Sequence, residues 1–455
     1  MDKLLPLGID AATGDLLPQV IPPAVLDSID EDPDSLQSRT ESHLGAAITD
    51  PNDLAKAGWC VLFLGTTDCT DLKAALKPLL DMRAAQAGGL FKILDKDLGY
   101  QPGDTAEQWL RRRHLDFHVV KPSAGVPYYV MIVGSPEEIP FEFQYKLDSY
   151  WAVGRIWFET IGEYAAYASK AAAADSAPSV KNVAIVATRH LADEATQSLH
   201  DFLAAPMVKG GGGDPPLGSD NGFALQPLLA ADATKANILD LLGGKRQGGR
   251  PSLIFSGSHG VRFDQTDANQ RLKQGALLCA DFPRRGATVD PTQYITEKDL
   301  GDIVLNGLIY FFFACYSAGC PKSDTYDRLP NGSEKPLMDA PIVARLPQGL
   351  LARGALAVIG HIDRAWTYSF VGAGAPQTQD FRFVLDLLMG GVRIGQAMDE
   401  FNRRWAVLSI ALSEGIQKRQ IPGQVSDDEL TAMWKARNDA RNYVILGDPA
   451  ARLNV

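Results

Sequence analysis

The sequence has little that would direct it to nucleic acid or to a membrane. Lys and Arg number 44 against 55 Asp and Glu, the net charge is −11, and the basic residues are scattered apart from the run at 111–113. A nucleic-acid-binding surface normally shows clustered basic residues. Pro, Gly and acids interrupt residues 1–20, and no apolar run reaches the roughly 20 residues of a membrane-spanning helix. We therefore expect a cytoplasmic protein with no direct nucleic-acid or membrane partner.

Cysteine is also sparse. The chain has five cysteines, an odd number, and none of them shows the paired spacing of a zinc site. This pattern favours free thiols in a reducing compartment over a disulfide framework. We expect no metal and no cofactor, and a free thiol such as Cys315 is then available for chemistry.

The remaining composition is that of an ordinary globular protein. Hydrophobic residues make up 45% of the chain and charged residues 22%, which are typical values for folded domains. At 455 residues, the chain exceeds the length at which one hydrophobic core normally keeps growing. We expect two or three structural units.

Two series of apolar runs indicate how these units are built. Strands are predicted in the first series at 59–65, 128–134 and 151–158, and in the second at 183–188, 253–257, 308–315 and 355–360. Apolar runs of this length, separated by helical stretches, indicate parallel strands buried on both faces. We expect an α/β fold with a mostly parallel sheet and two tandem subdomains, 51–178 and 179–455. Residues 1–50 are predicted to form an N-terminal extended arm, to which we assign no chemistry.

Two strands of the second series end at small-residue turns. The stretch SLIFSGSHG at 252–260 leads to His259, and FFFACYSAGC at 311–320 contains Cys315. Ligands of open parallel sheets bind beyond the carboxyl ends of the strands, and adjacent strands lie about 4.8 Å apart. If these two strands are neighbours, the imidazole and the thiol meet at one edge of the sheet.

This pair of side chains has a plausible chemistry and a plainer alternative. An imidazole can take the proton of a thiol and so produce a nucleophilic thiolate. The small residues around both positions let a substrate backbone approach and leave N–H groups free to face a developing oxyanion. The alternative is an inert buried thiol and a histidine in a turn. The joint placement at two strand ends favours the catalytic pair.

At these residues the sequence resembles the caspase-like (clan CD) cysteine peptidases. SGSHG and ACYSAG match the layout of their histidine and cysteine turns, which CHAT-type bacterial peptidases share. YYVMIVGSPEEIPF, LDSYWAVGRI and NYVILGDPAARL resemble segments of the gingipain family, in the same order, so that the resemblance extends over 59–455. It implies a three-layer αβα caspase-like fold, with a degenerate caspase-like subdomain before the catalytic one.

The resemblance also implies roles for particular residues. Cys315 becomes the nucleophile, His259 the general acid and base, and the backbone amides of Gly260 and Cys315 the oxyanion hole. The implied function is that of a cysteine endopeptidase that cleaves a protein partner, in a bacterial defence or self-killing pathway, with a possible activating protein or ligand. The chain departs from gingipains in a longer insertion between histidine and cysteine, and we expect neither their secretory leader nor their adhesin tail.

Three further residues are candidates for the substrate pocket. Trp366 lies where gingipain-like enzymes carry a pocket tryptophan, although a core aromatic is the alternative. Asp148 resembles an acidic residue of the family near the pocket or behind the histidine, and a carboxylate there would favour a basic substrate side chain. Asp363 is a third candidate. Its neighbour Arg364 is positively charged and could reverse the sign of the charge in the pocket.

Other functions and processing sites remain open on the sequence. A catalytically silent caspase-like scaffold would bind a partner without cutting it. A nucleotide-handling enzyme is disfavoured because the chain has no G-x-x-x-x-G-K-[ST] loop. The loops at 209–222 and 320–341 are predicted sites of activating cleavage or ordering, with Lys209 and Arg328 as cut points.

Overall fold

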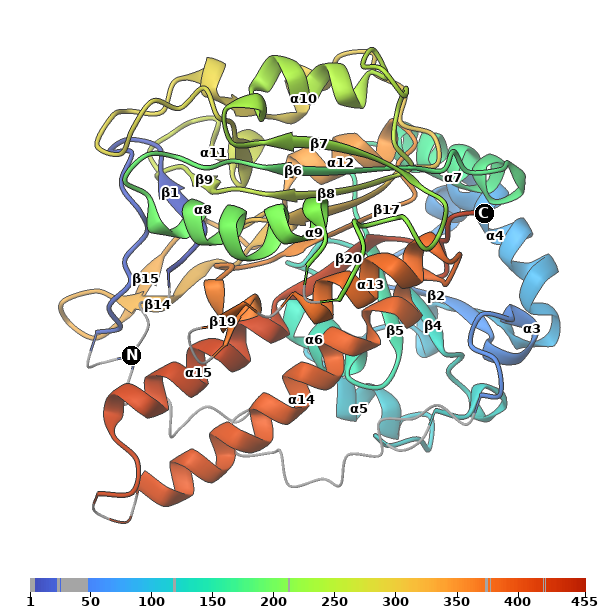
Figure 1. Ribbon diagram of the computed structural model, residues 1–455. Helices are drawn as coiled ribbons and strands as arrows, with labels where there is room; N and C mark the ends of the chain where they lie inside the picture. The colour runs from blue at the N-terminus through green and yellow to red at the C-terminus, as the bar shows by residue number, and fades with distance from the viewer. Residues whose placement is uncertain are drawn as a thin grey trace.

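A ten-stranded sheet with helices on both faces forms the centre of the molecule (Figure 1). The computed structural model describes residues 5–22, 25, 48–117, 120–211, 213–372, 375–376, 378–419, 421 and 423–455. The strand order is β3-β2-β4-β5-β20-β17-β12-β8-β6-β7. This arrangement is the mostly parallel α/β sheet that the sequence predicted.

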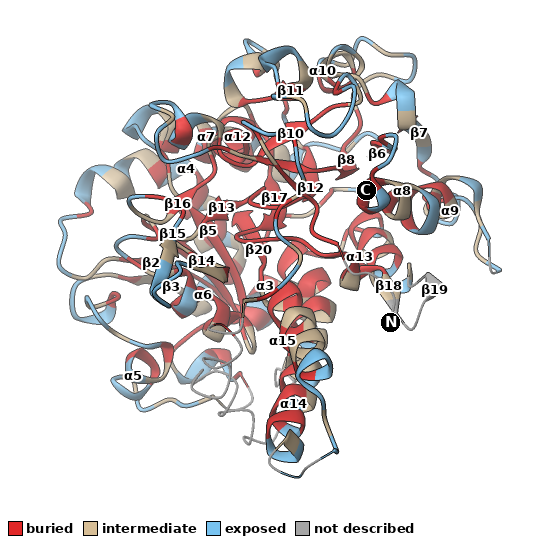
Figure 2. Ribbon diagram, turned by 90° about the vertical axis from the view of Figure 1, so that its left-hand side faces the viewer, coloured by how far each residue is buried: buried red, intermediate tan, exposed pale blue. Residues whose placement is uncertain are grey.

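The first half of the sheet contains four strands that all run parallel: β2 (Trp59–Phe63), β3 (Phe91–Leu94), β4 (Tyr129–Val133) and β5 (Ala152–Ile156). Every residue of β2, β4 and β5 is buried, which explains why these strands appear in the sequence as unbroken apolar runs. Helices α4 (Thr70–Ala87) and α7 (Ile161–Ser176) pack against each other beside this half (Figure 2).

The second half contains five more strands that run parallel to one another: β6 (Asn182–Ala187), β7 (Ala224–Leu229), β8 (Leu253–Gly257), β12 (Ile309–Phe313) and β17 (Ala357–His361). The helices of this half are α8 (Glu194–Leu199), α9 (Ala205–Lys209), α10 (Lys235–Leu242), α12 (Arg345–Ala352) and α13 (Gln379–Met389). The four apolar runs of the second series therefore form strands, as expected. The edge strand β7 was not predicted because most of its residues are exposed or half-buried.

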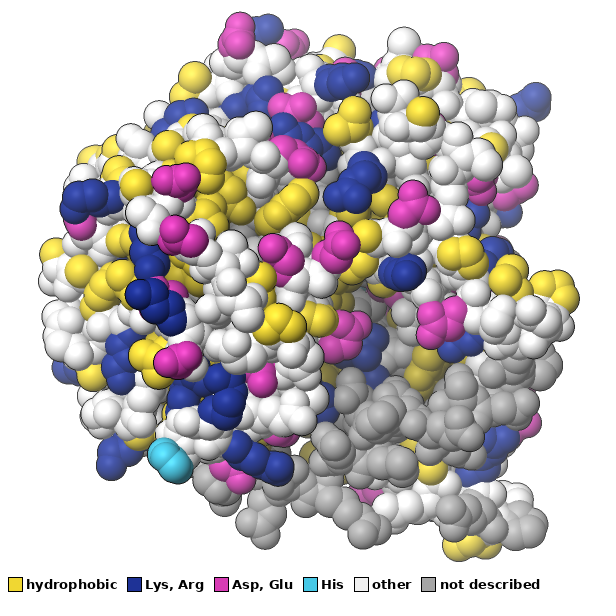
Figure 3. Space-filling view, turned by 180° about the vertical axis from the view of Figure 1, so that it is seen from behind, with side chains coloured by type: hydrophobic (Ala, Val, Ile, Leu, Met, Phe, Trp, Pro, Cys, Tyr) yellow, Lys and Arg dark blue, Asp and Glu magenta, His cyan; other side chains and the backbone are white. Residues whose placement is uncertain are grey.

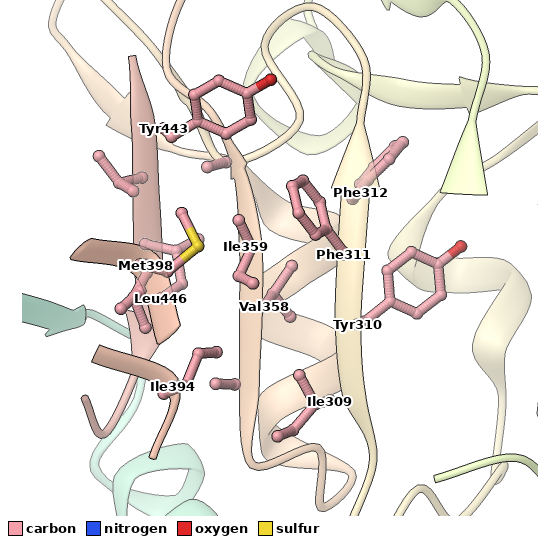
Figure 4. Close-up of a cluster of buried hydrophobic side chains, with 14 of the residues drawn as sticks. Ile309, Tyr310, Phe311, Phe312, Val358, Ile359, Ile394, Met398, Tyr443 and Leu446 are labelled. Atoms are coloured by element: carbon pink, nitrogen blue, oxygen red, sulfur yellow. The ribbon is translucent and has the colours of Figure 1, made fainter. Parts of the chain in front are cut away.

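Strand β20 (Tyr443–Gly447) joins the two halves of the sheet. It runs parallel to β5 and antiparallel to β17, so the two halves point in opposite directions. Side chains of β12, β17 and β20 pack together with Ile394 and Met398 (Figure 4). Both of these residues belong to α14 (Ile394–Arg419), which pairs with α15 (Asp427–Arg441) in a helical hairpin (Figure 1).

A small sheet extends the second half beyond the end of β8. It consists of β1 (Gly8–Asp10) and β9 (Gly260–Arg262), labelled in Figure 1, and of β10 (Ala276–Leu278) and β11 (Tyr294–Ile295), labelled in Figure 2, with β1 parallel to β9. Ile9 is fully buried in an apolar cluster with Val261, Leu278 and neighbouring side chains. The N-terminal segment, residues 5–22, therefore packs along the half of the molecule that contains Cys315 and His259.

The surface matches the composition of the chain. Acidic and basic side chains are interspersed over the face seen in Figure 3, without a continuous basic patch on that face. Among the described residues, none of the helices combines the length and the apolar character that a bilayer crossing requires.

A buried ion pair links the residue after the last strand to α4, and we expect its loss to lower the stability of the fold. Arg83 contacts Asp448 at 2.7 Å and Asp175 at 3.0 Å, and the side chains of Arg83 and Asp448 are almost fully buried. We expect Arg83→Met to lower the free energy of unfolding by about 3–5 kcal/mol, because it leaves the buried Asp448 carboxylate without its cation. Urea denaturation measures this loss.

A matched control lies on the same helix. Lys77 pairs with Asp81 at 2.6 Å, but both side chains are more than 60% exposed. We expect Lys77→Met to change the free energy of unfolding by less than about 1 kcal/mol. Equal effects of the Lys77 and Arg83 substitutions would contradict the interpretation.

Candidate active site

The two candidate catalytic residues lie at the ends of neighbouring strands. Strands β8 and β12 are adjacent and parallel, with Gly257 paired to Phe313. His259 and Cys315 each follow two residues later, and the amide of Ser258 donates to the carbonyl of Phe313 at 3.3 Å. The structure thus brings together, at one edge of the sheet, the two residues that the sequence singled out.

Two backbone amides at this edge converge on a single oxygen atom. The N–H groups of Gly260 and Cys315 both donate to the carbonyl of Leu7, at 2.9 and 3.0 Å. Position 260 requires glycine, because a Cβ there would lie 1.8 Å from the carbonyl oxygen of Cys315. Paired amides at such distances can stabilise negative charge on a carbonyl oxygen during acyl transfer.

The thiol of Cys315 is covered by the N-terminal segment. Cys315 is fully buried, and a Cβ placed on Gly8 would lie 2.8 Å from its Sγ and 2.5 Å from Cδ1 of Leu17. The amide of Ala365 donates to Sγ at 3.3 Å. Burial raises the pKa of the thiol well above its ordinary value, so in this covered state the sulfur is protonated.

His259 is held by a carboxylate on one side of its ring. Its Nε2 lies 2.5 Å from Oδ2 of Asp193, and both side chains are buried. Its Nδ1 has no hydrogen-bond partner within the described part of the chain. A carboxylate at one ring nitrogen sets the orientation and tautomer of an imidazole and leaves the other nitrogen available for proton transfer.

Asp193 was not found by the sequence analysis. It is the N-cap of α8, where its Oδ1 accepts from the amides of Ala195 and Thr196 at 3.1 and 3.4 Å. Burial opposes its ionisation, but the interaction with His259 outweighs burial and holds the pKa of Asp193 well below its usual range. One sequence feature could have indicated this residue: an aspartate directly before a helix is a typical N-cap. Because that helix follows β6, and β6 neighbours β8, the aspartate lies near the end of the strand that leads to His259.

Trp366 and Asp363 lie in the loop after β17, close to the N-terminal segment. The indole of Trp366 is fully buried, with its ring centroid 5.2 Å from that of Tyr326, while its backbone pairs with Pro6. The carboxylate of Asp363 accepts from the amide of Arg364, and burial raises the pKa of Asp363 to about 6. Trp366 therefore contributes its backbone to this edge, and its side chain belongs to the core.

Asp148 is not brought to the cysteine and histidine. It ends α6 (Phe141–Asp148) and accepts from the amide of Val153 at 3.0 Å. Burial raises its pKa well above the ordinary value. Its hydrogen-bond partners are Val153 and Asn402, which belong to β5 and α14 and not to the strand ends that carry Cys315 and His259.

A second histidine stacked on His259 predicts that the stability depends on pH. The rings of His190 and His259 are stacked with centroids 6.4 Å apart, and burial, with a smaller contribution from His259, lowers the pKa of His190 from 6.5 to about 4. Because the folded-state pKa is depressed, this group's contribution to stability is complete above pH 6.5 and is lost as the pH falls toward 4. Urea denaturation should show about 2 kcal/mol of this loss between pH 7 and pH 5.

The same measurement on His190→Gln provides the control. Since glutamine does not titrate, the fall in the free energy of unfolding between pH 7 and pH 5 should be smaller by about 2 kcal/mol in the variant. An identical pH dependence of the two proteins would contradict the assignment to His190.

Comparison by sequence yields no match: no family model matches the chain, and no curated protein matches it. Comparison of structures finds similarity to a chain described as a protease, with a TM-score of 0.51 and 14% identity, over 88% of this chain and 80% of that chain. The complex of pro- and mature domains of RgpB from Porphyromonas gingivalis gives a TM-score of 0.45 at 11% identity, over 87% and 80%. The separase–securin complex of Saccharomyces cerevisiae gives 0.35 at 12% identity, over 70% of this chain and 15% of separase.

These comparisons bear on the fold. At a TM-score of 0.51 over most of both chains, the protein shares the fold of the matched protease. The mostly parallel sheet with helices on both faces is the α/β architecture that the sequence predicted.

Proposed function

We propose that the protein is a cysteine endopeptidase in which Cys315 is the nucleophile and His259 the general acid and base. Asp193 orients His259, and the amides of Gly260 and Cys315 hold the oxyanion. The observation that carries this proposal is the convergence of both amides on one peptide carbonyl directly beside the buried sulfur. A carboxylate–imidazole pair at the adjacent strand end supports it.

The reaction follows from the positions of these groups. Nδ1 of His259 takes the proton of the Cys315 thiol, and the thiolate attacks the carbonyl carbon of a bound peptide. The two amides stabilise the negative oxygen that forms. The C–N bond breaks, the departing nitrogen takes the proton from His259, and water hydrolyses the thioester to a carboxylate and a free thiol.

The resemblance noted in the sequence extends the proposal to a biological setting. The histidine and cysteine turns resemble those of CHAT-type and gingipain-like peptidases, and in this proposal the strands before β6 form a subdomain without catalytic residues. The protein then cuts a partner protein in a bacterial defence or self-killing pathway in the cytoplasm, and an activating protein or ligand releases its activity.

A peptidyl acyloxymethyl ketone, which alkylates reactive thiolates, tests the catalytic pair. The probe is incubated with the full chain and with its Gly8→Ala variant, in which an added Cβ would collide with the sulfur of Cys315. The labelled residue is mapped by mass spectrometry. We expect label on Cys315 in the Gly8→Ala chain, and we expect it to be lost when His259→Ala is added to that chain. Cys60, Cys69, Cys279 and Cys320 are also buried and serve as internal controls. A Cys315 that stays unlabelled in both chains would support a scaffold that binds without cutting.

A further inference from the structure

Residues 5–10 cross the candidate active site, with a bend at Leu7 between the bridge residue Pro6 and strand β1. Before the site, the amide of Leu7 donates to Ala365 at 2.8 Å, the amide of Thr367 donates to Leu5 at 3.1 Å, and Pro6 forms an antiparallel bridge with Trp366. After the site, Gly8–Asp10 forms β1 and pairs with β9. The same short segment is therefore held by backbone pairing on both sides of Cys315.

The bond between Leu7 and Gly8 lies at the reacting position of this site. The carbonyl of Leu7 occupies the two-amide site, and Gly8 lies against the sulfur of Cys315 so closely that even a Cβ would collide with it. A peptide bond cut by a cysteine peptidase places its carbonyl oxygen on the oxyanion donors and its carbonyl carbon within reach of the sulfur. The carbonyl of Leu7 meets the first requirement, and its neighbour Gly8 lies against the sulfur.

We propose that residues 5–10, Leu-Pro-Leu-Gly-Ile-Asp, are a built-in substrate of this site. The bond between Leu7 and Gly8 is the one that Cys315 cuts, and the site accepts extended peptides with leucine before the cut and glycine after it. This proposal rests on the proposed function. The bond lies outside the two loops in which the sequence predicted processing.

The burial of the segment supports an apolar substrate. Leu7 is fully buried and belongs to the main apolar cluster of the protein, and Leu5 is 2% exposed in the same cluster. The carboxylate of Asp363 is already engaged by the amide of Arg364. A lysine or arginine in place of Leu7 would lose its water without gaining a dedicated partner from Asp148 or Asp363. This differs from the basic preference that an acidic pocket would produce.

The chain after β1 returns over the site and keeps the segment in place. The amide of Leu17 donates to the carbonyl of Gly8 at 3.0 Å. The buried guanidinium of Arg364, which pairs with Asp324, donates to the carbonyl of Pro18 at 2.7 Å. In the intact chain, the built-in substrate therefore excludes other peptides until it is cut or displaced.

The step is balanced without any further cofactor. The sulfur of Cys315 bonds to the carbonyl carbon of Leu7 as the bond to the nitrogen of Gly8 breaks, and that nitrogen leaves with the thiol proton through His259. Water then hydrolyses the thioester, which leaves a carboxylate on Leu7 and restores the thiol. The new amino terminus at Gly8 remains paired in β1, whereas the fragment that ends at Leu7 can dissociate.

The Gly8→Ala variant of the full chain tests the cover, and Gly89→Ala is its matched control. An added Cβ collides with the sulfur at position 8 but meets no described atom within 4 Å at position 89. We expect iodoacetamide to alkylate Cys315 at least about 10-fold faster in Gly8→Ala than in the unmodified chain, and Gly89→Ala to leave the rate unchanged. Leu7→Asp, which unseats the segment from its apolar cluster, should reproduce the acceleration. Alkylation rates that stay unchanged in both uncovering variants would overturn the proposal.

Peptide cleavage by the uncovered variants then tests the substrate class. We expect a peptide that contains Leu-Pro-Leu-Gly-Ile-Asp to be cut between leucine and glycine at least about 10-fold faster than the same peptide with lysine before glycine. Cleavage of other peptides without cleavage of this bond refutes the substrate assignment and leaves the proposed function intact. Faster alkylation of Cys315 with no cleavage in a peptide library refutes the proposed function and with it the substrate assignment.

Discussion

Replacing Cys315 by alanine in the Gly8→Ala chain should lower kcat/KM for peptide cleavage by at least about 10³-fold, because loss of a covalent nucleophile removes the acyl-enzyme route altogether. The paired amides of residues 260 and 315 remain, so any residual rate reflects binding and oxyanion stabilisation alone. The measurement is a fluorogenic peptide assay in which the active chain and Cys315→Ala are purified in parallel.

A buried cysteine elsewhere provides the control for this substitution. Cys60 lies in β2, in the other half of the sheet, and is as fully buried as Cys315. We expect Cys60→Ala in the same background to keep kcat/KM within about 3-fold, since its thiol packs in the core and touches no reacting group. Retention of more than a tenth of the activity by Cys315→Ala would show that another residue is the nucleophile.

Asp193→Asn should lower kcat by about 10²- to 10⁴-fold while KM changes little. The substitution keeps the size of the side chain but puts a neutral amide in place of the carboxylate that contacts Nε2 of His259 and sets its tautomer. Because the contact of Asp193 is with His259 and not with the segment in the site, a positioning role predicts that the loss appears in kcat. The full dependence of rate on substrate concentration separates the two constants.

The chain offers a matched aspartate–histidine pair at its surface. Asp201 lies 2.7 Å from Nδ1 of His200 and 3.1 Å from Arg189, with its side chain 44% exposed. Asp201→Asn should leave kcat within about 2-fold, because an exposed pair of this kind contributes little. If Asp193→Asn in the Gly8→Ala chain retained more than half of the kcat of that parent chain, Asp193 would have no part in orienting the imidazole.

Acid stability gives an independent measure of the Asp193–His259 pair. The folded-state pKa of Asp193 lies below its ordinary 3.8, so its contribution to stability is present above that pH and is lost as the pH falls below it. In Asp193→Asn this acid-side loss disappears. The free energy of unfolding of the variant should therefore depend less on pH below about 4, the ordinary carboxyl pKa, than that of the unmodified chain.

The strands that the sequence predicted share one physical property. Runs such as 128–134 and 308–315 are apolar throughout because parallel strands with helices on both faces are buried on both faces. Strands β3 and β7 lie at the two edges of the sheet, where partial exposure removes that signal. The sequence also could not predict that the strands of the two halves run in opposite directions, because this depends on which two strands pair with β20.

The candidate site likewise contains residues that local sequence pattern could indicate and residues that only tertiary contacts bring in. His259 and Cys315 could be placed because each follows its own strand, and the adjacency of β8 and β12 was a simple geometric expectation. Asp193 and Leu7 contact these two residues only through tertiary structure, because they lie far from them in the sequence. Asp193 and His259, for example, are 66 positions apart. Asp148 and Trp366 were inferred from family resemblance, and the structure places the first at the end of α6 and the side chain of the second in an apolar cluster.

The sequence by itself determined the fold class, the strands of the core and the two residues at their ends, because these follow from local hydrophobic pattern and turn composition. Only the tertiary structure decided that a carboxylate stands behind the imidazole and that residues 5–10 fill the site. The local sequence pattern does not specify where an extended segment docks. Docking depends on backbone hydrogen bonds to strands that are distant in the sequence and on the apolar side chains that the segment buries against them.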